Sequence, residues 1–276
     1  MDYNRENQEN FHKVVDVLNH IDYKVVLIHS DLFNGFKFNY RLSREDMLWS
    51  HYSILKKIFQ EIPIWMPTFN YDFPLSKEYD VHLTKSVVGA LTDFFRTKHA
   101  AWRSEVPVFS FAGEGEKPYI CENGIIDAFG TNSVFGQLIT NDGLIMFYGT
   151  DLLPATFVHY CEQISGVLTY RYFKTFEGKV INDNREKNVT LKFHVRPLRN
   201  VLEYDIKKLE HDLYAEGLLK DFTPFQTLLI KARHFSEYIT DRMKEDTLYL
   251  LTEDTRSWVE PKLQKLGRPF LITDFE

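Results

Sequence analysis

Three residues of chemical interest stand three positions apart in this chain, namely Thr156, His159 and Glu162. Such spacing on a helix places successive side chains on one face, so His159 and Glu162 can touch. A carboxylate there can fix the tautomer of the imidazole and raise its basicity, which suits a general base near neutral pH. The pattern indicates proton-transfer chemistry, although a His and a Glu at this spacing also occur often without any function.

Thr156 lies one turn before His159, at the expected start of the same helix. Its hydroxyl could meet a developing negative charge on a substrate, or it could simply satisfy the first backbone N–H groups of the helix. The sequence leaves both roles open.

This stretch follows a buried strand in the sequence pattern. The apolar run over 144–148 predicts the strand, Gly149 a turn, and Pro154 the first residue of a helix. The helix would then start at the carboxyl end of a sheet strand, where α/β proteins commonly build their sites.

The two cysteines, Cys121 and Cys161, fit no paired metal or redox spacing and are expected to be free thiols. Cys161 lies two residues from His159, which on a helix means roughly 200° of rotation, so the two cannot readily meet. An acyl-enzyme on Cys161 is therefore the least favoured mechanism. The sequence also lacks the G-x-S-x-G, H-E-x-x-H and Walker patterns of other enzyme classes.

The elements around this stretch alternate between helical and strand periodicity, which is typical of an α/β protein. Two runs of period two, over 168–174 and 189–195, predict an antiparallel pair with polar residues 182–184 between them. We expect one domain over 1–276, with a central mixed, mostly parallel sheet flanked by helices. Other predicted helices cover 11–21, 43–59, 84–96, 135–139, 203–215 and 233–244, and other predicted strands cover 25–28, 62–69 and 108–111.

Composition excludes several classes of protein. The 276 residues include 33 Lys and Arg against 39 Asp and Glu, so the net charge of −6 disfavours a nucleic-acid binder. No apolar window is long enough to span a membrane, and the first ten residues are polar and contain no apolar leader. We therefore expect a cytoplasmic protein with no membrane or nucleic-acid partner. Nothing in the sequence decides whether it forms a homodimer.

Several motifs, taken in order over about residues 24–170, resemble the aminoglycoside 3-N-acetyltransferase family. Its members often read T-x-x-H-H-x-E where this chain has Thr156, His159 and Glu162. Three differences stand out: Tyr160 replaces a His, Val106 a His and Val134 a Pro. The other matching segments are the H-S-S-L-like end of 26–32, the P-T-F of 67–69, the T-P-S-x-x-G-x-L-like start of 84–91, the R-S-x-H-P-x-x-S-like 103–110 and the G-x-x-S-like 130–138.

The resemblance implies that family's α/β fold, which differs from the GNAT fold, and acetyl transfer from acetyl-CoA straight to an amine on a sugar ring. In that scheme His159 is the base, Glu162 orients it, and Thr156 lies near the thioester. No metal is expected, because His29 and Asp31 alone make an incomplete ligand set. The positions similar to those that hold CoA in the family are His29, Ser30, Asp31, Leu32, Thr84, Ser86, Ser104, Val108, Phe109 and Ser110.

The acceptor stays open at this point. An aminoglycoside and an amino sugar carried on a nucleotide both fit, although a surplus of only six acids does not demand a polycationic ligand. A non-catalytic relative that binds CoA or a sugar as a regulator or scaffold is the alternative.

Overall fold

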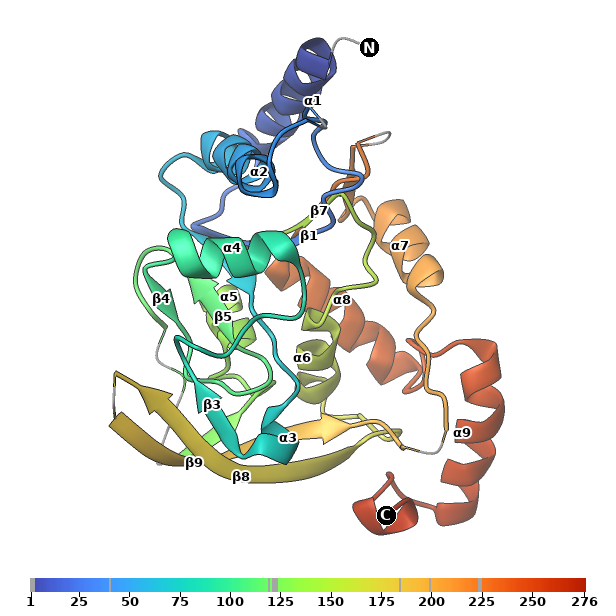
Figure 1. Ribbon diagram of the computed structural model, residues 1–276. Helices are drawn as coiled ribbons and strands as arrows, with labels where there is room; N and C mark the ends of the chain where they lie inside the picture. The colour runs from blue at the N-terminus through green and yellow to red at the C-terminus, as the bar shows by residue number, and fades with distance from the viewer. Residues whose placement is uncertain are drawn as a thin grey trace.

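A seven-stranded mixed sheet forms the centre of the computed structural model, which describes residues 3–39, 41–118, 120, 124–183, 185–198, 200–222 and 225–276 (Figure 1). The three central strands, β7, β1 and β2, are parallel neighbours, and the outer pairs are antiparallel. The sheet is therefore mixed, as predicted, but the expectation of a mostly parallel sheet was wrong, because among the described strands of this sheet only the β7–β1 and β1–β2 pairings are parallel. In spatial order its strands are β10 (Lys220–Asp221), β11 (Leu228–Lys231), β7 (Gly143–Tyr148), β1 (Val25–Ser30), β2 (Ile64–Pro67), β5 (Phe111–Gly113) and β4 (Trp102–Arg103).

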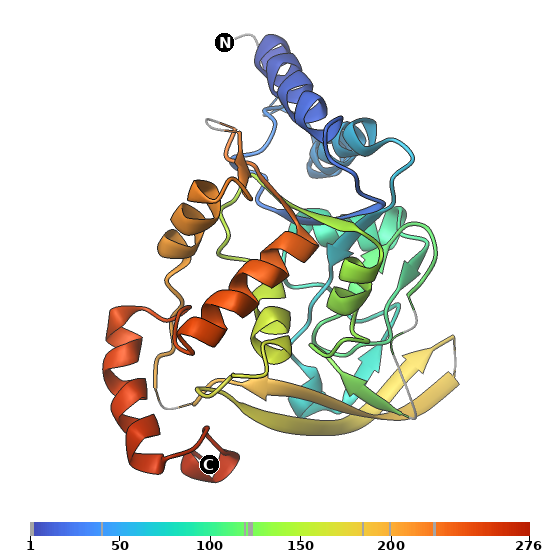
Figure 2. The same cartoon turned by 180° about the vertical axis from the view of Figure 1, so that it is seen from behind.

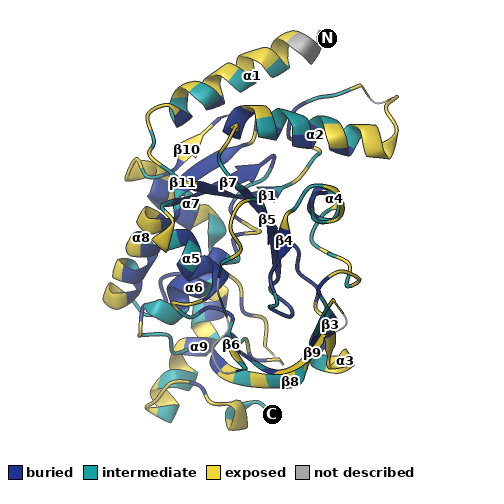
Figure 3. Ribbon diagram, turned by 90° about the vertical axis from the view of Figure 1, so that its left-hand side faces the viewer, coloured by how far each residue is buried: buried dark blue, intermediate teal, exposed yellow. Residues whose placement is uncertain are grey.

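The central strands read as unbroken apolar runs because helices cover both faces of the sheet. Every residue of β7 is buried, as are the first five of β1. Figure 3 shows the resulting layers, with α1, α2 and α4 on one face and α5, α6 and α8 on the other. These helices are α1 (Tyr3–Leu18), α2 (Arg44–Phe59), α4 (Ala90–Lys98), α5 (Val134–Thr140), α6 (Phe157–Ile164) and α8 (Ala232–Glu245).

A second sheet of four strands lies across the far side of α6 (Figure 1). Its strands are, in order, β3 (Glu78–Asp80), β8 (Tyr172–Asn182), β9 (Arg185–Val195) and β6 (Ile125–Asp127). The antiparallel pairing of β8 with β9 confirms the pair predicted from period-two alternation, but β8 begins at Tyr172 rather than at 168. The sequence did not predict that this pair would form a separate sheet.

The remaining elements wrap around these layers. Figure 2 shows α9 (Glu253–Leu266) at the left-hand edge of the molecule, descending toward the C-terminal turn. The last residue, Glu276, is tied to the second sheet because Tyr172 donates a hydrogen bond of 2.9 Å to its carboxylate. The other helical segments are α3 (Phe73–Ser76), α7 (Ile206–Ala215) and η1 (Ile272–Asp274), and none of the described helices has the length and apolar character needed to cross a lipid bilayer.

Three predicted starts of helices or strands were wrong. The helix predicted from Thr84 begins at Ala90, because the carbonyl oxygens of Val81 and Thr84 accept hydrogen bonds from the buried Arg103 instead of helical N–H groups. The strand predicted from Val108 begins at Phe111, because Val108 has a left-handed backbone with φ of 67°.

The helix predicted from Pro154 begins at Phe157. Pro154 lies in a turn that is closed by a bond of 2.9 Å from Ala155 N to Leu152 O. A residue far along the chain holds this turn, since the carboxylate of Glu210 on α7 accepts a hydrogen bond of 2.8 Å from Leu152 N.

Candidate active site

The turn after β7 brings α6 to the carboxyl edge of the central sheet. Gly149 has φ of +70°, and a Cβ built on it would lie 2.0 Å from the carbonyl oxygen of Asp31. Only glycine allows the loop after β7 to pack this closely on the loop after β1. The loop that leads from β7 to α6 therefore packs against the loop after β1, at the carboxyl edge of the sheet.

His159 and Glu162 are in contact, as their spacing predicted. His159 Nδ1 lies 2.8 Å from Glu162 Oε2, and the carboxylate is fully buried while the imidazole keeps 24% of its side chain exposed. Because an ionised carboxylate only accepts hydrogen bonds, Nδ1 must carry the hydrogen. The other ring nitrogen, Nε2, then keeps its lone pair.

Tyr204 supports the same assignment of the proton on His159. Its hydroxyl donates to Glu162 Oε1 at 2.6 Å, so its single hydrogen is used there. The same hydroxyl lies 3.1 Å from His159 Nδ1 and can therefore only accept from that nitrogen.

The carboxylate of Glu162 is the centre of a larger network. Around it lie two tyrosines, an arginine and a second histidine, which come from the segment after α6, from β9 and from the β9–α7 connection. The contacts to Oε1 are Tyr170 Oη at 2.8 Å, Arg171 Nε at 3.3 Å and Tyr204 Oη at 2.6 Å, and His194 Nε2 lies 3.2 Å from Oε2.

The network sets the charges at the site. Burial alone would favour a neutral Glu162, but Arg171 and the two histidines outweigh it and hold the pKa of that carboxyl well below its usual range. Burial and then Arg171 lower the pKa of His159 to about 4, against a weaker opposing effect of Glu162. Near neutral pH the site therefore holds a carboxylate and a neutral imidazole.

Sequence reasoning missed four members of this network: Tyr170, Arg171, His194 and Tyr204. The first two lie in the run 170–173, whose aromatic residues indicated only faces for stacking, and the alternation of β9 assigned His194 to the face opposite Phe193. In the structure Phe193 and His194 are both buried, because the end of β9 is covered on both faces. His194 fits the alternation as a polar residue, so the strand pattern carried no signal of its burial or of its contact with Glu162.

Thr156 occupies the N-cap position of α6 but does not cap it, since its side chain makes no hydrogen bond to the helix backbone. Its hydroxyl lies 3.4 Å from Pro154 O, at the limit of a hydrogen bond. The hydroxyl is thus largely uncommitted and lies one turn from His159.

Cys161 and Tyr160 lie away from the exposed edge of His159. Both are buried in the core, where the Tyr160 ring packs 5.3 Å from that of Phe157. Burial raises the pKa of the Cys161 thiol well above its usual value, which opposes thiolate chemistry. Cys121 lies outside the described residues.

The first group of expected CoA residues lies at the carboxyl end of β1, in register with the end of β7. His29 is buried and stacks on Phe147 at 5.2 Å, and its Nε2 has no hydrogen-bond partner among the described residues. Burial lowers the pKa of His29 to about 4, so its imidazole is neutral. Within the described part of the chain Ser30 Oγ likewise has no partner, whereas Asp31 is exposed and Leu32 partly buried.

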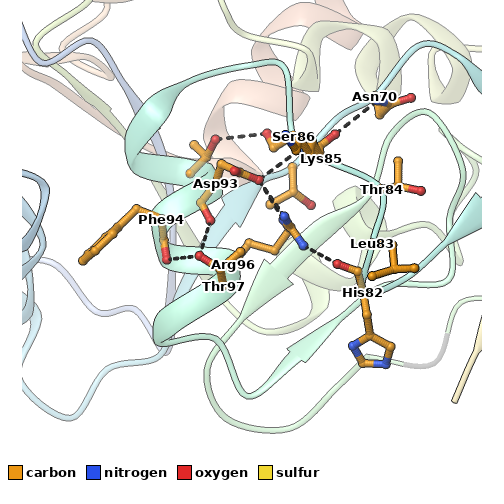
Figure 4. Close-up of polar contacts among 12 residues, drawn as sticks. Asn70, His82, Leu83, Thr84, Lys85, Ser86, Asp93, Phe94, Arg96 and Thr97 are labelled. Atoms are coloured by element: carbon orange, nitrogen blue, oxygen red, sulfur yellow. Dashed lines mark hydrogen bonds and ion pairs between the residues drawn. The ribbon is translucent and has the colours of Figure 1, made fainter. Parts of the chain in front are cut away.

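The second group, Thr84 and Ser86, lies in the loop before α4 (Figure 4). Thr84 Oγ1 accepts from Asp80 N at 3.0 Å, and Ser86 N donates to Asp93 Oδ1 at 3.0 Å. Asp93 also pairs with Arg96, which donates to His82 O at 2.7 Å. The loop is thus held firmly against α4, but it is no helix start.

The third group, Ser104 to Ser110, is largely committed to internal bonds. Ser104 Oγ accepts from Phe111 N at 2.9 Å, and Ser110 Oγ donates to Thr68 O at 2.7 Å. Val108 is buried, and its carbonyl accepts from Asn70 N at 3.1 Å. Phe109 is only partly buried and packs 4.8 Å from Phe129, whose ring lies 5.3 Å from that of His159. Phe109 alone of this group therefore connects to the His159 region through ring packing.

Three donor atoms of the site, on His159, Glu162 and His194, lie within 4.8 Å of one another and could in principle hold a cation. A divalent cation there would need the proton-bearing Nδ1 of His159 to be stripped and would lie next to the guanidinium of Arg171. The donor set thus fits a hydrogen-bonded network better than a cation, and the expectation of a metal-free site stays a prediction.

A partly exposed imidazole backed by a buried carboxylate, on an α/β scaffold, is an arrangement that can accept a proton. The sequence profile of the aminoglycoside 3-N-acetyltransferase family matches residues 49–244. The chain belongs to this family, which comprises acetyl-CoA-dependent acyltransferases.

Solved structures of the family share the fold at low sequence identity, whereas no curated protein sequence gives a significant match. AAC-IIIb, binary with CoASH, superposes with a TM-score of 0.68 at 13% identity over 85% of this chain and 96% of its own. AAC-VIa bound to sisomicin superposes with a TM-score of 0.64 at 17% identity, over 85% of this chain and 97% of its own. The YokD protein from Bacillus subtilis superposes with a TM-score of 0.64 at 14% identity, over 87% of this chain and 93% of its own.

Proposed function

We propose that this chain transfers the acetyl group of acetyl-CoA directly to an amine of an amino sugar, with His159 as the general base. One observation carries the proposal: Nδ1 of His159 donates to the buried Glu162, so that Nε2, on a partly exposed ring, is left as the acceptor. The bound ligands of AAC-IIIb and AAC-VIa support the choice of the two substrates.

The reaction forms one C–N bond, breaks one C–S bond and moves one proton from the nitrogen to the sulfur. The neutral amine attacks the thioester carbonyl carbon, the C–N bond forms, and the nitrogen becomes cationic and much more acidic. His159 Nε2 takes the proton from that nitrogen, and Glu162 stabilises the resulting imidazolium. The C–S bond then breaks, and the CoA thiolate leaves as a thiol with the proton that His159 held.

The low pKa of His159 suits this order of events. A weak base cannot efficiently deprotonate a free ammonium group, but it can take the proton of the acidic nitrogen in the tetrahedral adduct. Thr156, with its largely uncommitted hydroxyl, is proposed to lie near the thioester oxygen or the departing sulfur.

For acetyl-CoA we propose the edge formed by the ends of β1 and β5 and the loop before α4. The buried atoms His29 Nε2 and Ser30 Oγ support this placement, because neither has a partner in the residues that the structure describes and buried polar atoms normally find one. Ser104 and Ser110 would act by holding the walls of the site, since their hydroxyls are already bonded internally.

For the acceptor we favour a cationic amino sugar over a nucleotide-linked one. A cavity of about 610 Å³ opens beside the loop that leads into α6, and its lining contains the three acidic residues Asp151, Glu210 and Asp221 against one lysine, Lys207. Such a set of carboxylates suits ammonium groups better than phosphates.

The test is a thiol-release assay with acetyl-CoA and three acceptors: an aminoglycoside, a nucleotide-linked amino sugar and water alone. We expect release above the water control with the aminoglycoside, and unchanged rates after treatment with EDTA. Release only with the nucleotide-linked sugar would overturn the acceptor assignment. CoA binding without release on either amine would favour the non-catalytic alternative.

A further inference from the structure

Glu162 Oε2 lies between two imidazoles. It is 2.8 Å from His159 Nδ1 and 3.2 Å from His194 Nε2. The two rings differ in access, because 24% of the His159 side chain is exposed and none of the His194 side chain is. Only His159 can therefore meet a substrate, and His194 can act only through Glu162.

The hydrogen-bond directions around His194 are determined by its neighbours. Glu162 is a carboxylate, so a bond to it requires a hydrogen on His194 Nε2. On the other side, Gln163 Nε2 donates to both oxygens of Asp127 at 2.9 and 3.0 Å, which turns Gln163 Oε1 toward His194. The distance from that oxygen to His194 Nδ1 is 3.4 Å, beyond an ordinary hydrogen bond. The strong polar contact of His194 is thus the one to Glu162.

The ring of His194 is also held by packing. The centroid of Phe129 lies 5.1 Å from it, and that of Phe173 on β8 lies 6.0 Å away. His194 itself stands on β9, so the second sheet delivers a rigid donor to the catalytic helix. The other carboxylate oxygen, Oε1, is held by Tyr170, Arg171 and Tyr204. Without His194, the only described contact of Oε2 in this network would be the one to His159.

We propose that His194 is a positioning residue that holds Glu162 Oε2 in line with His159 Nδ1 and so keeps His159 in the tautomer with a free Nε2. This inference rests on the proposed function of His159 as the base. It assigns the second sheet, through His194 on β9, a role in turnover in addition to packing against α6.

Two amide substitutions of His194 distinguish the role of its Nε2 from that of its Nδ1. In His194→Gln the amide nitrogen can occupy roughly the place of Nε2 and donate to Glu162, whereas in His194→Asn it reaches only the place of Nδ1. We expect His194→Gln to keep kcat within about threefold of the wild type and His194→Asn to lower it by about 10- to 100-fold, with the KM for acetyl-CoA unchanged in both. Equal kcat values in the two variants, or a loss expressed in KM, would overturn the proposal.

A second readout does not depend on turnover. Nitrogen-15 NMR of the His159 imidazole should report the Nδ1–H tautomer in the wild type and in His194→Gln, and a mixture of tautomers in His194→Asn. The same tautomer in all three proteins would refute the positioning role even if no amine were acetylated. If the wild type releases no CoA with any acceptor but the tautomer shifts as expected, the proposed function fails and the positioning stands.

Circular dichroism melts of each variant check folding. If His194→Asn does not fold, His194→Phe replaces it, since that variant keeps the ring packing against Phe129 and removes the donor. The expected tautomer mixture and loss of kcat are the same.

Discussion

The hydroxyl of Tyr204 lies 2.6 Å from Glu162 Oε1, although 42 residues separate them in the chain. Arg171 Nη2 donates to the same hydroxyl at 2.6 Å and its Nε approaches the same carboxylate oxygen at 3.3 Å. Tyr204 and Arg171 therefore hold Oε1 of Glu162 in place, while Oε2 faces His159 and His194. The ionised carboxylate at the centre is stable in the core only because this shell surrounds it.

Replacing His159 tests the base. We expect His159→Gln to lower kcat by about 10²- to 10⁴-fold, because the variant has no lone pair of comparable basicity at the position of Nε2. The Kd for CoA, measured by calorimetry, should stay within about twofold. His234→Gln, at an exposed position of α8, is the matched control and should retain full activity. Normal turnover of His159→Gln would remove the base assignment.

Glu162→Gln should cost stability as well as turnover. It leaves the buried guanidinium of Arg171 without its charged partner, and breaking a buried ion pair in this way costs roughly 3–5 kcal/mol. Urea unfolding measures the loss. Glu177→Gln, exposed on β8, is the control and should change the free energy of unfolding by less than about 0.5 kcal/mol. A stable but inactive Glu162→Gln would indicate that the carboxylate contributes only to the chemistry.

Cys161→Ala should keep kcat within about threefold of the wild type. The thiol is buried, and its raised pKa keeps it protonated at neutral pH. Turnover by the CoA-release assay, before and after treatment with an alkylating reagent, is the measurement. A loss of more than about 100-fold with CoA binding intact would revive a thiol mechanism.

Arg103→Lys should lower the free energy of unfolding by about 2–3 kcal/mol. All five N–H groups of Arg103 are used, on oxygens of Thr68, Val81, Thr84 and Ser110. Lysine offers only three donors and no planar fork, so two acceptors lose their partner. Arg185→Lys, exposed at the start of β9, is the control for urea unfolding, and equal values for the two variants would contradict the structural role of Arg103.

Stability should fall as the pH is lowered from about 6.5 to 4. Burial lowers the pKa of His29 and of His51 to about 4, so in this window the unfolded chain binds protons that the folded chain does not. Each group then removes on the order of 3 kcal/mol of stability across the window.

The slope of unfolding free energy against pH tests this effect. In His51→Gln the slope between pH 6.5 and 4 should be shallower than in the wild type, whatever the change in absolute stability. His12→Gln, at an exposed position of α1, should leave the slope unchanged. An unchanged slope in His51→Gln would show that His51 does not contribute to the pH dependence.

The family and the core of the site could be predicted from local patterns. Three-residue spacing on a helix dictates that His159 can reach Glu162, and a run of buried apolar residues dictates a strand at 144–148 whatever surrounds it. The N-cap of α2 is equally local, since Ser43 Oγ accepts from Asp46 N three residues later. Such features depend on neighbours within one or two turns, which the sequence displays directly.

Long-range contacts decided the rest. Whether 84–89 forms helix or loop depended on Arg103, whose guanidinium takes the carbonyl oxygens of Val81 and Thr84 from about twenty residues away. The partners of Glu162 were decided in the same way, because His194 and Tyr204 reach it only once the second sheet and the segment before α7 pack against α6. A buried charge selects its partners by distance in space, and that distance has no local signature in the sequence.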